Sequence, residues 1–161
     1  MTKSSQAHEI LAKMGELCPA GFAIGMHLEF TTSRYIFQTY PKSWMEEYSR
    51  KGLIVVDPTV RWGVENLGWI RWSDLSAMDE GGVIKAAATY GLTYGVSIAI
   101  EATGTRTLGS FAHSEREFTE SEINDLSQLL TQLHEVTGSV DPESDDDKAL
   151  ARLAGTLASV Q

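Results

Sequence analysis

Residues 96–114, VSIAIEATGTRTLGSFAHS, decide how this chain folds. Within residues 96–100, valine and isoleucine alternate with serine and alanine, which is the period of a strand that buries one face. Residues 103–105, Thr-Gly-Thr, supply a turn, and residues 107–114 follow as a second strand of mixed pattern. The stretch therefore predicts two strands joined by a short turn.

The segment after this stretch predicts a long amphipathic helix. Thr119 and Glu122 are three residues apart and match a capping box, in which each residue bonds the backbone N–H of the other. Gly138 is placed to end the helix. The apolar positions between them form one continuous face, made of Ile123, Leu126, Leu129, Leu130, Leu133 and Val136.

The N-terminal part predicts a helix followed by another hairpin. Residues 5–18 carry apolar side chains at helical spacing. Residues 22–28 alternate as a half-buried strand, residues 31–33 read as a turn, and residues 35–39 form a second strand. Helices and antiparallel hairpins in this order predict an α+β fold, an α-β-α sandwich with helices on both faces of one antiparallel sheet.

The middle of the chain predicts short helices. Residues 41–51 begin with a proline, which suits the first turn of a helix, and Gly52 is placed to end it. Residues 57–66 begin with Asp-Pro, an N-cap and a proline at the first helical position. Residues 69–72 read as irregular or extended, and residues 79–90 read as another helix.

Composition sets limits on the function. The 161 residues are 42% hydrophobic, enough for one core, and contain one cysteine, which fits a reducing cytoplasm. The net charge of −9 disfavours direct DNA binding, because DNA affinity depends on cations that neutralise phosphates. No run approaches the roughly 20 apolar residues of a membrane span. We expect one domain over residues 1–138, followed by an acidic, solvated linker and a short helix over residues 139–161.

Four residues of the middle segment are candidates for a binding site. Trp44 and Tyr48 are i and i+4 on one helix face, and Tyr40 lies four residues before Trp44. Rings with one polar tip suit a ligand that is mostly hydrocarbon with a small polar head, although the same spacing serves ordinary core packing. Asp57 can accept an amide N–H from a ligand, or it can simply cap the helix that follows it.

Catalytic and metal-binding patterns are not found in the sequence. The four histidines fall in separate segments, and no nucleophile–base–orienter set can be assembled. Cys18 is expected to be a core residue, and residues 145–147, Asp-Asp-Asp, lack the spacing of a calcium loop. We therefore expect a protein that is not an enzyme and carries neither a metal nor a cofactor.

One ordered set of residues points to a family. The set runs Tyr40-Pro41-x-x-Trp44-x-x-x-Tyr48, then Asp57-Pro58-Thr59-Val60, then Trp72. It resembles the autoinducer-binding domain of LuxR-type quorum-sensing receptors, and within them it is most similar to the LasR-like branch. Residues 90–96 and the later Leu108-Gly109 also fit the family pattern, so the resemblance covers residues 5–137. It implies a GAF/PAS-like sandwich that encloses an N-acyl-homoserine lactone.

The resemblance also implies roles for single residues. Trp44 donates to the lactone carbonyl, Tyr40 donates to the amide carbonyl, and Asp57 accepts the amide N–H. The remaining implied site residues are Tyr48, Thr59, Trp72 and Ser110.

Two departures from the family pattern bear on the ligand. Relatives carry a hydroxyl on the strand where this chain has Ala112, and Ser110 replaces it only if the strand is regular. LasR-like members carry an arginine where this chain has Met45, which weakens an assignment of a 3-oxo acyl chain.

The C-terminal segment departs further from the family. Relatives continue into a helix-turn-helix domain, and residues 139–161 do not resemble one. The resemblance implies a homodimer, with residues 123–136 as a reasonable surface, or a heterodimer with a full-length receptor. Two alternative functions stay open: an anti-activator that inactivates such a receptor without signal, and an enzyme that hydrolyses the lactone or the amide.

Overall fold

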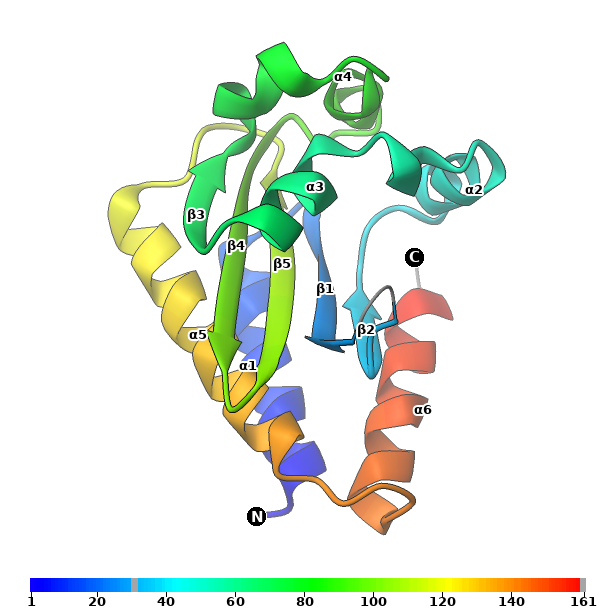
Figure 1. Ribbon diagram of the computed structural model, residues 1–161, viewed down its shortest axis with the longest axis vertical. Coiled ribbons are helices and arrows are strands. Elements are labelled where there is room, and N and C mark those ends of the chain that lie inside the picture. The colour runs from blue at the N-terminus through cyan, green and yellow to red at the C-terminus, as the bar shows by residue number, and fades with distance from the viewer. Residues whose placement is uncertain (30–31, 160–161) are drawn as a thin grey trace.

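The computed structural model describes residues 1–29 and 32–159. A sheet of five antiparallel strands, ordered β2-β1-β5-β4-β3, lies between two layers of helices. Figure 1 shows α3 in front of the sheet and α1 and α5 behind it. The predicted α-β-α sandwich is confirmed. The strands are β1 (Gly21–Leu28), β2 (Tyr35–Gln38), β3 (Gly68–Arg71), β4 (Tyr94–Ala102) and β5 (Thr105–His113).

The hairpin predicted from residues 96–114 is confirmed as β4 and β5. The two strands pair without a register shift from Tyr94 and His113 to Ala102 and Thr105. Gly104 takes a positive φ of 84°, which a glycine adopts without steric cost. Because side chains alternate along both regular strands, one face of the hairpin is directed at each helical layer.

The back layer consists of α1 (Lys3–Leu17), α5 (Glu120–Gly138) and α6 (Asp145–Ser159). The capping box is present, since the Thr119 hydroxyl accepts from the N–H of Glu122 and the Glu122 carboxylate accepts from that of Thr119. This carboxylate also bonds Arg116, and these contacts lower the pKa of Glu122 to about 2. Four residues of the predicted stripe of α5 are fully buried in the core: Ile123, Leu126, Leu130 and Leu133.

The sequence predicted that the acidic segment over residues 141–147 is solvated, but part of it contacts the rest of the fold. Helix α6 begins inside it and runs for 15 residues. Asp147 accepts a hydrogen bond from the hydroxyl of Tyr35 and forms an ion pair of 3.5 Å with Arg34. Leu150, one turn later, is fully buried in the same core as α1 and α5. Helix α6 is therefore part of the packed structure.

The front layer contains α2 (Lys42–Arg50), α3 (Pro58–Glu65) and α4 (Val83–Ala88), with the 3-10 turns Leu53–Val55 and Trp72–Met78. Pro41 is the N-cap of α2 and not a residue of its first turn. The predicted helix over residues 79–90 is shortened at both ends, and the larger change is at its start. There the Asp79 carboxylate accepts from the backbone N–H of Val83 and Gly82 is left-handed, so α4 begins after them.

The predicted alternation of β1 fails at His27. This residue has a φ of 51°, and the register with β5 shifts between Gly25 and Leu28. The bulge buries His27 next to Met26, where strict alternation would place them on opposite faces. The turn predicted over residues 31–33 lies partly outside the described residues, of which Glu29 and Thr32 form a bridge. None of the helices in the described residues has the length and apolar character that a membrane span requires.

Candidate functional site

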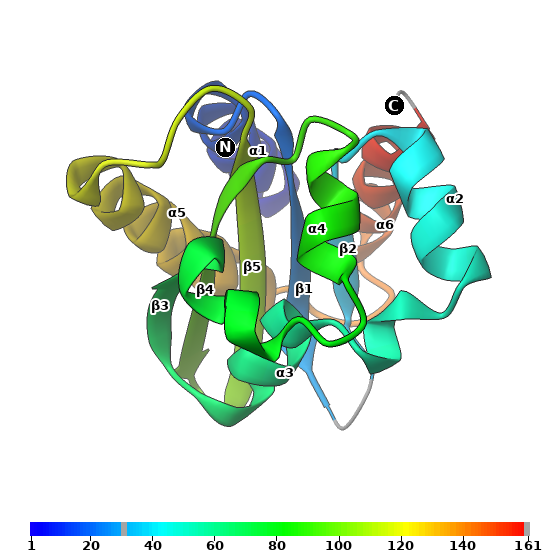
Figure 2. The same cartoon turned by 90° about the horizontal axis from the view of Figure 1, so that it is seen from above.

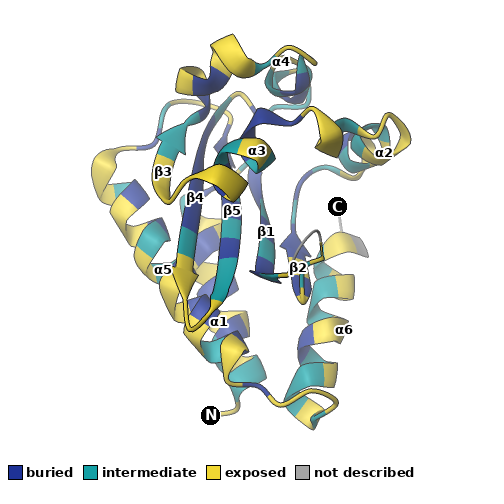
Figure 3. Ribbon diagram, viewed as in Figure 1, coloured by how far each residue is buried: buried dark blue, intermediate teal, exposed yellow. Residues whose placement is uncertain are grey.

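An aromatic and polar cluster lies between the sheet and the front layer. Figure 2, the view from above, shows α3 and α4 on the side of the sheet opposite α1 and α5. The burial colouring of Figure 3 shows buried residues along the central strands and exposed residues on the outer side of α2. The buried apolar members of this front cluster are Tyr40, Trp44, Trp72, Val83, Ala87, Leu92 and Ala112.

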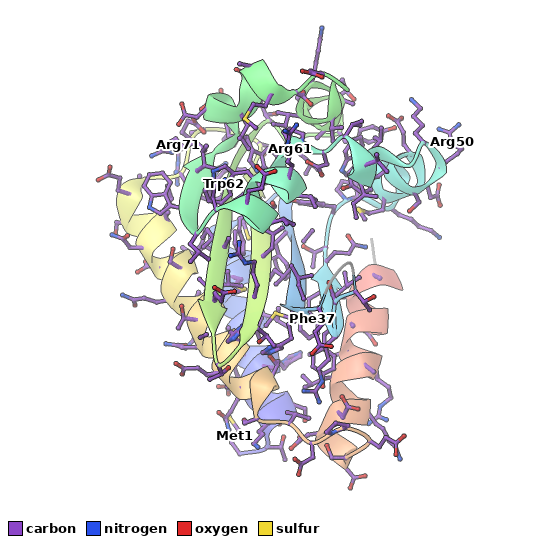
Figure 4. All side chains as sticks on the ribbon, in the orientation of Figure 1. Met1, Phe37, Arg50, Arg61, Trp62 and Arg71 are labelled. Carbon is purple, nitrogen blue, oxygen red and sulfur yellow. The ribbon has the colours of Figure 1, made fainter. Side chains whose placement is uncertain are left out.

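Helix α2 contributes the central ring of the cluster. Trp44 is only 3% exposed. Its ring meets that of Tyr48 edge-on at 5.8 Å and that of Tyr90 at 5.4 Å. The predicted i, i+4 face of α2 is therefore directed inward, while Arg50 at the end of the helix points away from the sheet (Figure 4).

The Asp57 carboxylate caps α3 with one oxygen and accepts a hydrogen bond from Tyr48 with the other. Its Oδ1 accepts from the backbone N–H of Thr59 at 2.9 Å and from the Thr59 hydroxyl at 2.7 Å. Its Oδ2 accepts from the Tyr48 hydroxyl at 2.8 Å. The predicted N-cap is confirmed, and it occupies one oxygen. A carboxylate has about four acceptor positions, so Oδ2 retains one for a further donor.

The two tyrosine hydroxyls of the cluster are held in the protonated, hydrogen-donating form. Burial raises the pKa of Tyr48, and the neighbouring Asp57 raises it further. Burial likewise raises the pKa of Tyr40 well above its ordinary value. The Tyr40 hydroxyl donates to the backbone carbonyl of Ser110 over a long 3.2 Å. This bond is weak enough in geometry for a better acceptor to replace it.

Trp72 lies against the sheet because β4 has a glycine there. A Cβ added to Gly95 would be 2.0 Å from the Trp72 ring, so only glycine admits this contact. The indole N–H of Trp72 donates to Ser97 Oγ at 3.1 Å, and Ser97 Oγ is 2.7 Å from Ser110 Oγ. Because β5 is regular, Ser110 and Ala112 lie on the same face of the strand. This was the condition on which the sequence predicted Ser110 as a site residue.

One donor of the cluster has no protein partner. Within the described residues, the Trp44 indole N–H makes no hydrogen bond. Among the described residues, every side-chain nitrogen or oxygen that is inaccessible to solvent has a hydrogen-bond partner. The Trp44 N–H therefore lies at an open surface, although the residue as a whole is almost completely buried.

The seven site residues predicted from the sequence form two connected groups. Trp44, Tyr48, Asp57 and Thr59 make one group, joined by ring contacts and by hydrogen bonds to the carboxylate. Tyr40, Trp72 and Ser110 make the other, joined by hydrogen bonds through Ser97 and through the Ser110 carbonyl.

Sequence reasoning missed Ser97 and Tyr90. Ser97 was detectable, because Ser97 and Ser110 are equally far from the turn at Thr103-Gly104 and must therefore be cross-strand partners. Tyr90 had no such signal, because the sequence placed it at the end of a helix over residues 79–90, whereas α4 ends at Ala88 and Tyr90 follows it.

A groove of about 690 Å³ lies beside this cluster, between α1 and α6 and next to the start of β1. Tyr90 lines the groove and also contacts Trp44, so its ring stands between the two. The Tyr90 hydroxyl donates to Glu47 of α2 at 2.8 Å. Among the residues that the structure describes, no three histidine, cysteine or acidic side chains are grouped so as to hold a metal ion.

Solved structures of known proteins share this fold. The chain aligns over 86% of its length with CepR2 from Burkholderia cenocepacia, an N-acylhomoserine lactone dependent LuxR-family factor, at 17% identity and a TM-score of 0.64. It also aligns over 94% of its length with residues 1–171 of Escherichia coli SdiA, at 22% identity and a TM-score of 0.61. The alignments cover 84% and 86% of those chains.

Curated relatives are transcriptional regulators. The chain is 30% identical over 100 residues to the transcriptional activator VanR of Vibrio anguillarum, and 36% identical over 94 residues to SolR of a Ralstonia nicotianae strain. These matches cover 61% and 57% of this chain but only 40% and 39% of the relatives, so it spans well under half of their length. The family model of the autoinducer binding domain matches residues 19–137. The chain therefore belongs to the autoinducer-binding domain family of LuxR-type quorum-sensing regulators.

Proposed function

We propose that this chain binds an N-acyl-homoserine lactone at the front cluster, as the non-catalytic sensory domain of a LuxR-type regulator. The observation that carries the proposal is the indole N–H of Trp44, which has no protein partner within the described residues, on a ring that contacts the Tyr48 of the Tyr48–Asp57 pair. A solvent-accessible donor that no protein group satisfies, on an otherwise buried aromatic residue, favours a ligand that brings its own acceptor.

The polar groups of the cluster match those of the lactone head. Such a ligand has a ring carbonyl, an amide carbonyl and one amide N–H. In the proposed complex the ring carbonyl accepts from Trp44 and the amide carbonyl accepts from Tyr40, which gives up its long bond to the Ser110 carbonyl. The amide N–H donates to the remaining position on Asp57 Oδ2. Each polar group of the ligand then has a partner, which matters because one buried mismatch costs about 1–3 kcal/mol.

The acyl chain requires apolar surroundings. The front cluster supplies them with partly buried apolar side chains from α2, α4 and the turn between α2 and α3: Met45, Leu53, Ile84 and Ala86. Each methylene that the ligand buries contributes about 0.8 kcal/mol.

Two further properties belong to the same proposal. The net charge of −9 supports a chain that makes no direct contact with DNA and acts through a second copy or a full-length receptor. The single cysteine, Cys18, is buried, and burial raises the pKa of its thiol to about 12, which suits an unreactive thiol in a reducing cytoplasm.

The test is a pair of matched tryptophan substitutions. Trp44→Phe keeps a ring and removes the indole N–H, while Trp69→Phe makes the same change on β3, where the side chain is 41% exposed. Binding of a lactone panel is measured by calorimetry for the parent and both variants. We expect Trp44→Phe to weaken binding about 5- to 100-fold and Trp69→Phe to leave it unchanged. Equal binding by Trp44→Phe and the parent would place the ligand elsewhere.

A further inference from the structure

Tyr90 links the end of α4 to α2 at the boundary between the groove and the front cluster. Its ring centroid lies 5.4 Å from that of Trp44, and the same side chain lines the groove between α1 and α6. Its hydroxyl donates to Glu47 Oε1 at 2.8 Å, and the other oxygen of this carboxylate lies 3.4 Å from Lys51 Nζ. One side chain therefore separates the two spaces and is tied to the helix that carries Trp44.

The rest of this boundary has little side-chain bulk. Of the described residues, two both line the groove and pack against the front cluster, Ala20 and Tyr90. Gly21 also lines the groove, and a Cβ added to it would be 3.1 Å from the Tyr40 ring. Tyr40 is almost completely buried, whereas Tyr90 is half-buried. The Tyr90 ring is therefore the large group whose displacement would join the groove to the front cluster.

The Tyr90 ring can move while its backbone stays in place. The backbone N–H groups of Tyr90 and Leu92 both donate to the carbonyl of Ala87 in α4, at 2.9 and 3.2 Å. The bond between the Tyr90 hydroxyl and Glu47 lowers the pKa of the carboxyl and raises that of the hydroxyl, so at neutral pH a protonated phenol donates to a charged carboxylate. Both residues are partly exposed, and water can take the place of either partner when the ring rotates away.

The groove suits an uncharged molecule that is mostly apolar. Its volume of about 690 Å³ lies within the range of small-molecule pockets, about 300–1,000 Å³. Although 22% of the chain is charged, none of the described residues that line the groove is aspartate, glutamate, lysine or arginine. Apolar side chains reach it from three elements: Leu11 of α1, Phe22 of β1 and Leu153 of α6. An acyl-homoserine lactone carries no charge, so it can enter this groove without the desolvation of a charged group.

We propose that the lactone reaches the front cluster through the groove between α1 and α6, and that Tyr90 is the gate. This inference rests on the proposed function. Trp44, which binds the ring carbonyl in the proposed complex, is the residue of the head-group site that Tyr90 contacts. The head group is therefore bound next to the gate, so the acyl chain enters first and the lactone ring last. The bond to Glu47 then holds the Tyr90 ring in its closed position.

The first experiment measures rate constants, because a gate acts on entry and exit alike. Association and dissociation of N-hexanoyl- and N-decanoyl-homoserine lactone are followed by stopped-flow tryptophan fluorescence for the parent, Tyr90→Phe and Tyr94→Phe. The control Tyr94→Phe removes a hydroxyl that makes no hydrogen bond within the described residues. We expect Tyr90→Phe to raise both rate constants about 2- to 12-fold, as the loss of one hydrogen bond allows, and to leave the dissociation constant unchanged. Tyr94→Phe should match the parent.

A second pair of variants tests the groove itself. Gly15 lines the groove, and a Cβ added to it would have no heavy atom within 4 Å, so the ring of Gly15→Trp can fill the groove without a clash at its base. The control Glu9→Trp adds the same ring to α1 at an exposed position outside the groove lining. We expect Gly15→Trp to slow association and dissociation by the same factor, and Glu9→Trp to leave both unchanged.

The comparison of rates separates a gate from a residue that contacts the bound ligand. If Tyr90→Phe weakened binding through faster dissociation alone, Tyr90 would be a ligand contact and the inference would be overturned. Rate constants like those of the parent in either Tyr90→Phe or Gly15→Trp would also overturn it, and the proposed function would stand. Absence of lactone binding by the parent would overturn both proposals.

Discussion

Removal of the Asp57 carboxylate should destabilise the fold by more than the loss of a helix cap. The substitution Asp57→Ala removes the acceptor for the N–H of Thr59, and a lost N-cap costs about 0.5–2 kcal/mol. It also leaves two partly or fully buried hydroxyls, those of Thr59 and Tyr48, without their acceptor. A stranded donor costs about 1–3 kcal/mol, less where water can reach it. We expect the free energy of unfolding to fall by about 2–5 kcal/mol in total.

A double-mutant cycle isolates the hydrogen bond between Tyr48 and Asp57. Tyr48→Phe alone should cost about 1–2 kcal/mol, because its hydroxyl donates to a charged acceptor at 2.8 Å. In the Asp57→Ala background the same change should cost little, since the hydroxyl has already lost its partner. The expected coupling energy is about 1–2 kcal/mol.

The assay is unfolding by urea at neutral pH for the parent, both single variants and the double variant, with linear extrapolation at a common slope. Tyr94→Phe serves as the control, because the Tyr94 hydroxyl makes no hydrogen bond within the described residues, and it should change stability by less than about 0.5 kcal/mol. A coupling energy below about 0.5 kcal/mol would refute the assignment of the Tyr48–Asp57 bond.

Three other expectations follow from packing and charge. Gly95→Ala places a Cβ 2.0 Å from the Trp72 ring and should lower the stability measured by thermal unfolding by about 1–3 kcal/mol. Gly15→Ala, which has open space in α1, should raise the stability by about 0.5–1 kcal/mol. Equal effects of the two substitutions would contradict the contact between Gly95 and Trp72. Burial and the nearby His134 lower the pKa of His27 to about 4, so the free energy of unfolding should fall as the pH drops from about 6.5 toward 4. His27→Asn should flatten this pH dependence. An unchanged pH dependence would assign the effect to other groups. Leu150→Ala should cost about 2–5 kcal/mol by calorimetry, and a loss below 1 kcal/mol would show that α6 does not stabilise the core.

The sequence predicted those elements whose local signals agree with their burial. The first strand of the β4–β5 hairpin alternates regularly and one glycine turn follows it, and the structure differs from the prediction only at the strand ends. The capping box of α5 was equally secure, because both of its hydrogen bonds join residues three apart. The site face of α2 followed from the spacing of Trp44 and Tyr48.

The features that the sequence did not predict depend on distant partners. His27 takes a left-handed conformation because its ring is bound by Thr105 and Thr137, which are far from it in sequence. Asp147 is only partly exposed because it contacts Tyr35 and Arg34, which are far from it in sequence. No local sequence pattern predicts such contacts, because an acidic run such as residues 145–147 is typical of a solvated segment.

The central claim is that the front cluster closes around an intact lactone, and the most direct measurement is the melting temperature against a panel of N-acyl-homoserine lactones. Ring-opened forms of the same compounds serve as controls, and the protein must first be shown to be free of ligand carried through purification. At 100 times its dissociation constant a ligand stabilises by about 2.7 kcal/mol, which for a domain of this size raises the melting temperature by about 5–10 °C. The account predicts such a rise for intact lactones, greatest at one chain length. No rise, or an equal rise with the ring-opened forms, would contradict it.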